Sequence, residues 1–175
     1  MHIQHGRHEQ AVATAKRALE LSSSDADAQI ALARALILIG LPKESLASIE
    51  VAERLDPYSE ARHQIFRGMA EFGLQNYAAA VESLDRSFKL NSSNALSTVA
   101  LAAAYGHLGQ IEKGQAAWQT FVDFEFTEFY IYNIVSVLSH FPYKHDDDKD
   151  RLATGLRLIG VPENFSEQDK IEAAQ

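Results

Sequence analysis

The chain has 175 residues, of which 46% are hydrophobic and 23% charged, a balance typical of a soluble folded protein and not of a disordered one. Its formal net charge of −8 repels phosphate backbones, so the sequence predicts no nucleic-acid partner. The absence of cysteine excludes disulfides, thiolate catalysis and cysteine-ligated zinc. The apolar runs are too short to cross a bilayer and the N-terminus has no signal core, so we expect a cytoplasmic protein without a membrane partner.

Four segments related by a repeat of about 34 residues run along the chain, at 11–21, 45–55, 80–90 and 114–124. Small or apolar residues recur in them at four offsets that fall on one helical stripe. In order of offset, the four columns are Ala11, Ser45, Ala80 and Gly114; Ala15, Ile49, Leu84 and Trp118; Ala18, Ala52, Ser87 and Phe121; and Leu21, Leu55, Leu90 and Phe124. The spacing predicts one helix in each unit, with equivalent residues in equivalent places.

A second helix is predicted before three of these segments, at 28–40, 61–73 and 95–109, each ending at or near glycine. The linkers between units are rich in Ser, Asp, Asn and Pro, which suit turns and can cap the N–H groups of the next helix. The sequence therefore predicts a series of helical hairpins.

These hairpins resemble the tetratricopeptide repeat (TPR). The family's small eighth residue corresponds to Ala33, Gly68 and Ala102, and its closing proline survives only as Pro57. The residues that match the family's glycine near the interhelix turn are Gly6, Gly40 and Gly109, with Gln75 in the third unit. The resemblance covers roughly residues 6 to 124 and implies an all-α fold, a right-handed TPR-like solenoid of helical hairpins with C-terminal capping helices.

The expected TPR array spans residues 1–126, with a partial first unit at 1–25 and further units at 26–59, 60–94 and 95–126. Only a few residues stand where most of the first helix of the first unit belongs. We expect the chain to be a fragment or to begin inside a longer array; the alternative is that this short piece is an irregular cap.

Capping helices are expected over 127–163, followed by a flexible tail at 164–175. The first should begin at the N-cap Thr127 and be stopped by Pro142. Its predicted apolar face consists of Ile131, Ile134, Val135 and Leu138. The second, over 150–160, buries Leu152, Leu156 and Ile159 and ends at Gly160. The aromatic residues gathered at 118–143 are interpreted as a plug for the last repeat, with an aromatic ligand cage as the alternative.

The stretch KHDDDKD (144–150) raises the question of a metal site. A metal site needs ligands that converge from different structural elements, and four aspartates in one turn do not provide this. The preferred interpretation is therefore an acidic helix start. The sequence also lacks HExxH, GxSxG and phosphate-loop motifs. We therefore predict no catalytic residue, no metal ligand, no cofactor and no enzymatic activity in this chain. The alternative is a small metal-dependent enzyme that uses the His and Asp clusters.

Residues 141–163 resemble the tail that follows TPR arrays in bacterial class III adenylate or guanylate cyclases and in some winged-helix regulators. The matching residues are Pro142, Tyr143, Lys144, Arg151, Leu152, Gly155, Leu156, Arg157, Gly160, Pro162 and Glu163. The resemblance implies a regulatory module of a multidomain bacterial signalling protein, with any catalytic domain outside this chain.

In TPR arrays the first helices of the units line a concave groove, and the family's groove positions carry over to this sequence. The groove residues expected here are Ile30, Arg34, Ile37, Arg62, Ile65, Met69, Phe72, Val99 and Ala103. Their apolar character predicts binding of an apolar or helical peptide of a protein partner, with the two arginines available for polar contacts (the polar handles of the groove). The alternatives are that the chain's own terminal helices fill the groove, or that the exposed N-terminal helix forms a homo-oligomer.

Overall fold

The structure is a computed structural model that describes residues 5–91, 95–124 and 133–164. Every regular element in these ranges is an α-helix, which confirms the all-α prediction. The helices are α1 (His5–Leu21), α2 (Ala26–Leu38), α3 (Pro42–Leu55), α4 (Glu60–Gly73), α5 (Tyr77–Leu90), α6 (Ala95–His107), α7 (Ile111–Phe124), α8 (Ile134–Leu138) and α9 (Asp146–Leu158).

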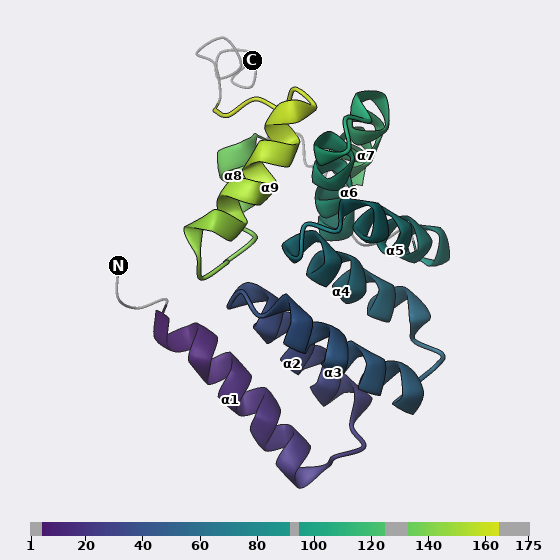
Figure 1. Cartoon of the computed structure of the whole chain (residues 1–175), viewed down its shortest axis with the longest axis vertical. Helices are drawn as coiled ribbons and strands as arrows, with labels where there is room; N and C mark the ends of the chain where they lie inside the picture. The colour runs from purple at the N-terminus through teal and green to yellow at the C-terminus, as the bar shows by residue number, and fades with distance from the viewer. Residues whose placement is uncertain (1–4, 92–94, 125–132, 165–175) are drawn as a thin grey trace.

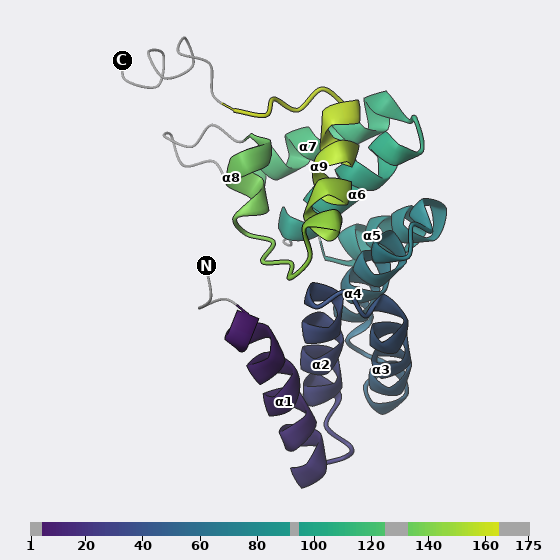
Figure 2. The ribbon, with the colours of Figure 1, turned by 60° about the vertical axis from the view of Figure 1, so that its left-hand side comes forward.

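The helices stack as a solenoid of hairpins (Figure 1). Helix α2 pairs with α3, α4 with α5 and α6 with α7, while α1 packs against α2 as α3 packs against α4. The first helices of the three hairpins, α2, α4 and α6, also contact one another in order and so form one continuous face. Helix α9 lies on that face against α6, with α8 beside it (Figure 2). The predicted solenoid with C-terminal capping helices is confirmed.

The predicted helical stripe lies largely in the core at its second and third columns, where Trp118 and Ala18 are the partly buried members. Ile49, Leu84 and Ala52 are fully buried, and Ala15 is 6% exposed. In the fourth column the described residues Leu21 and Leu90 lie at the surface instead, 80% and 53% exposed. These leucines are the last residues of α1 and α5, where the chain leaves the hairpin for a polar linker, so periodicity alone overestimates the length of the buried face.

The turns inside the hairpins show the expected glycine geometry. Gly40 and Gly109 have φ values of 78° and 70°, and Gln75 adopts the same left-handed conformation at 63°, as its alignment with the glycines predicts. At each turn the next residue donates its N–H to a carbonyl five residues earlier, for example from Asn76 to Glu71 at 2.9 Å, which ends the helix in a Schellman motif. Gly6 was wrongly matched to this position, because it lies within α1.

Replacing Gln75 by glycine is expected to stabilise the protein by about 0.5–1 kcal/mol. The left-handed conformation costs a non-glycine residue about 1–2 kcal/mol, and the extra backbone entropy of glycine in the unfolded chain offsets part of the gain. Gly109→Ala should lower stability by about 1–2 kcal/mol, because its Cβ would meet no atom within 4 Å and only the backbone conformation changes. Urea unfolding followed by circular dichroism measures both; shifts of the same sign would contradict the expectation.

The capping helices differ in their limits from the prediction. The first does not run continuously from residue 127, because Asn133 is extended and caps α8 through a hydrogen bond from the N–H of Ser136 at 2.7 Å. Thr127 and Ile131 lie outside the described residues. On α8, Ile134 is fully buried as predicted, but Val137 faces the core and Val135 is 53% exposed. Helix α9 begins earlier than predicted, at Asp146, and ends before Gly160, whose φ is 88°.

Candidate functional site

The expected groove residues lie on the face formed by α2, α4 and α6, and the structure divides them into a covered and an open group. Val99 and Ala103 of α6 are fully buried. Helix α9 covers them at a close crossing: a Cβ added to Gly155 would lie 2.4 Å from the carbonyl oxygen of Ala103. A Cβ added to Gly106 would lie 2.0 Å from the carbonyl oxygen of Gly155. At α6 the chain's own C-terminal helix therefore fills the groove.

Residues 140–145, which we call the strap, connect α8 to α9 and lie against the C-terminal end of α2. The N–H of Lys144 donates to the carbonyl oxygen of Leu38 at 2.7 Å. One residue further on, Nε2 of His145 donates to the carbonyl oxygen of Ile39 at 3.1 Å. The strap therefore covers part of α2 in the first complete hairpin, as α9 covers α6.

The strap also contacts the N-terminal part of α1. Nε2 of His8 donates to the carbonyl oxygen of Pro142 at 2.5 Å, and Lys144 Nζ pairs with Glu9 at 2.5 Å. The Lys144 hydrogen bond lowers the pKa of the Glu9 carboxyl. These bonds join α1, the first helix of the array, to the strap.

The aromatic side chains of the strap are part of the core. Phe141 is 2% exposed and Tyr143 is 7% exposed, and their rings stack with centroids 6.1 Å apart. Burial raises the pKa of the Tyr143 hydroxyl, and the nearby Asp148 carboxylate raises it further. Phe121 of α7 is buried as well. These described aromatics are core residues, but Phe141 and Tyr143 lie beside Ile37 and Met69 of the first two complete hairpins, so a plug of the last repeat stays a prediction. The aromatics at 124–132 lie outside the side chains that the structure describes.

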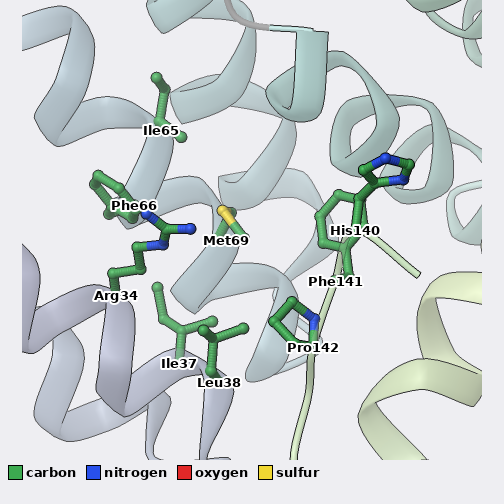
Figure 3. Close-up of a pocket in the computed structure, with 9 residues that line it drawn as sticks. All are labelled: Arg34, Ile37, Leu38, Ile65, Phe66, Met69, His140, Phe141 and Pro142. Atoms are coloured by element: carbon green, nitrogen blue, oxygen red, sulfur yellow. The ribbon is translucent and has the colours of Figure 1, made fainter. Parts of the chain in front are cut away.

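One part of the groove stays open between α2, α4 and the strap, as a pocket of about 150 Å³ (Figure 3). Its lining residues are Arg34, Ile37, Leu38, Ile65, Phe66, Met69, His140, Phe141 and Pro142. Four of these were expected from the repeat register. Phe66 and Leu38 fall between the family's groove positions. The strap residues carry no signal in the repeat, because they reach the pocket only by folding back from the C-terminal region.

The remaining expected groove residues have structural partners. Ile30 is 5% exposed and packs with Ile49. Phe72 is 3% exposed, and its ring meets that of Tyr77 edge-on at 5.4 Å. Arg62 pairs with Asp27 at 2.5 Å. Of the two predicted polar handles, only Arg34 therefore lies at the open pocket without an ion pair to another described residue.

The acidic stretch 144–150 spans the start of α9, with Asp146, Asp147 and Asp148 in the first turn at the positive end of the helix. This confirms the helix-start interpretation, but the aspartates do not cap the helix, because the N-cap is His145 and its side chain makes no capping bond. Asp148 pairs with Arg151 at 2.7 Å. In the described parts of the chain, no three His, Asp or Glu side chains converge in a way that could hold a metal.

His63 of α4 is a buried titratable residue that sequence reasoning did not single out. It is 1% exposed, and its Nε2 has no hydrogen-bond partner among the described residues. Burial lowers the pKa of the imidazole, the carboxylates of Glu53 and Asp56 raise it in part, and the nearby Arg62 and Arg67 lower it.

Stability is therefore expected to fall as the pH drops below about 6.5, the pKa of an unperturbed imidazole. Below that pH the unfolded chain binds a proton that folded His63 accepts only at lower pH, so stability falls by up to about 1.4 kcal/mol per pH unit. Above it the ring is neutral in both states, and the contribution is constant. Urea unfolding from pH 5 to 8 should give a flatter profile for both His63→Asn and His63→Leu, whatever their stability at pH 8. An unchanged slope in both variants would refute this origin of the pH dependence.

None of the described helices is both long and apolar enough to cross a membrane.

No curated protein matches the chain. The tetratricopeptide repeat family model matches residues 2–60. Among solved structures, MamA has a TM-score of 0.62 at 20% identity over 100% of this chain and 99% of that chain. YrrB, described as a TPR protein with an unusual peptide-binding site, has a TM-score of 0.54 at 17% identity, over 97% and 82%. Residues 2–60 therefore match the tetratricopeptide repeat, and the described chain has a helical-hairpin fold like that of the TPR protein YrrB.

Proposed function

We propose that this chain is a non-enzymatic protein-interaction module that binds an apolar or amphipathic helical segment of a partner protein. The binding site is the pocket between α2, α4 and the strap. The observation that carries the proposal is that this pocket stays open on the concave face, next to the part at α6 that α9 covers, and is lined by groove residues of both α2 and α4. Its floor and walls are mainly aliphatic and aromatic, as in grooves that take the apolar face of a helix.

Two further features support this site. Met69 stands in the pocket, and its flexible, polarizable side chain can adapt to ligands of different shape. Ile65 is only partly buried, so apolar surface is available for contact. The likeness to YrrB is consistent with a peptide ligand, since that structure is described as having a peptide-binding site.

Binding can be tested with a fluorescein-labelled amphipathic peptide that carries leucine at every third or fourth position on an alanine and glutamine background. We expect measurable fluorescence anisotropy binding to the wild-type protein and at least about tenfold weaker binding to Ile65→Asp, since the aspartate removes apolar contact surface and places a charge where the apolar face of the peptide would be buried. Leu90→Asp is the matched control, because Leu90 is exposed at the end of α5, outside the pocket. Equal binding by wild type and Ile65→Asp would refute the site, and unfolding curves of the variants show whether the fold is retained.

The wider setting that we propose is the cytoplasmic regulatory array of a multidomain bacterial signalling protein, of the cyclase or winged-helix regulator type. It rests on the resemblance of residues 141–163 to the tails of such proteins. The genomic reading frame around the coding sequence tests it: a cyclase or DNA-binding domain joined in frame would support the setting, and a frame that encodes neither would refute it.

A further inference from the structure

The open pocket combines apolar walls with one unpaired cation. Arg34 is exposed on α2, lines the pocket, and has no hydrogen bond or ion pair to another described residue. Figure 3 shows its guanidinium directed toward the space between Phe66 and Met69. Several other arginines of the array are neutralised by an acidic neighbour, including Arg67 with Glu53 at 2.8 Å. An exposed guanidinium at the edge of the pocket is available to pair with an anionic group of a ligand.

We infer that the pocket recognises a single large apolar side chain of a partner helix together with a carboxylate next to it, which pairs with Arg34. This inference rests on the proposed function and names the chemistry of its partner. The guanidinium supplies planar donors that match a carboxylate in geometry and charge. Charge complementarity at Arg34 therefore selects an acidic side chain beside the apolar anchor.

The size of the pocket limits the apolar part of the ligand to one anchor. An apolar cavity of about 150 Å³ is large enough for a molecule such as benzene, which is comparable to a phenylalanine or leucine side chain. Pro142 and Phe141 of the strap close the pocket on one side, and Ile37 and Ile65 lie on the helices opposite. A second large side chain of the partner would have to lie outside this pocket.

The charge of the whole chain limits the acidic part of the ligand. With a formal net charge of −8, the protein repels polyanionic partners at long range. Arg34 alone offsets one negative charge at the pocket. The fitting ligand therefore carries one carboxylate beside its anchor and not a long acidic run.

Three capped helical peptides test this inference; they share one leucine or phenylalanine anchor and differ only in having Glu, Gln or Lys one turn away. We expect the wild-type protein to bind the Glu peptide about two- to fivefold more tightly than the Gln peptide, the range of an exposed ion pair, and the Lys peptide most weakly. NMR titration of the isotopically labelled protein measures such weak binding and locates it. Arg34→Gln should bind the Glu and Gln peptides equally, and Arg34→Glu should prefer the Lys peptide.

Arg54→Gln is the matched control, since Arg54 is exposed near the end of α3 and does not line the pocket, and it should keep the preference of the wild type. Equal binding of the Glu and Gln peptides by the wild type, or a preference that survives in Arg34→Gln, would overturn the inference. If the peptides bind in an Ile65-dependent way without charge preference, only the role of Arg34 fails. If no peptide binds, the proposed function fails with it.

Discussion

Gly155→Val is expected to detach α9 from the solenoid and to cost more than about 3 kcal/mol. A Cβ at this position would lie 2.4 Å from the backbone oxygen of Ala103, where no side chain can rotate away to make room. Detachment exposes Leu152, Leu156 and Ile159, all at most 2% exposed, and burying such a side chain contributes about 1.5–3 kcal/mol. Helix propensity cannot cause the loss, because valine is a better helix former than glycine.

Hydrogen exchange measured by mass spectrometry should show faster exchange in α9 and in the face of α6 that carries Val99, together with a lower urea midpoint. Thr154→Val is the matched control: Thr154 is exposed on the same helix, so the same side chain placed one position earlier should leave both measurements near wild type. Wild-type exchange rates and stability in Gly155→Val would show that the close crossing of α6 and α9 does not hold the cap.

Leu84→Ala is expected to lower the free energy of unfolding by about 3–4 kcal/mol. Leu84 is fully buried in α5, and Gly68 of α4 leaves the space that its side chain fills. Truncation removes the buried methyl groups and leaves a cavity, a combination that costs about 2–5 kcal/mol for leucine in a core. Urea unfolding followed by circular dichroism provides the measurement.

Leu90→Ala is the matched control for Leu84, because it makes the same truncation on the same helix. Leu90 is 53% exposed, so we expect a change within about 0.5 kcal/mol. Comparable losses at the two positions would mean that the predicted stripe is buried along its whole length, contrary to the structure.

The repeat units were readable from the sequence because their signals are local. A helical period needs only residues three and four apart, which is why the series through Ile49 and Leu84 identified the buried faces. A Schellman end needs one residue in the left-handed conformation, so aligning Gln75 with the glycines correctly predicted its backbone geometry. Errors occurred where a helix ends, at Leu21 and Leu90, because the chain leaves the hairpin there and the helical period does not show where packing stops.

The candidate site depended on contacts between distant parts of the chain. The repeat register predicted four of the six pocket residues on α2 and α4 and missed Leu38 and Phe66. It also treated all three first helices as equivalent, whereas α6 is covered by α9. His145 reaches the carbonyl of Ile39 across 106 positions of sequence, and nothing in the local pattern of either residue predicts that bond. Sequence alone determined a stack of helical hairpins with an apolar concave face. Only the tertiary structure decided which part of that face stays open, because packing of the C-terminal segment onto it is a long-range contact that periodicity does not encode.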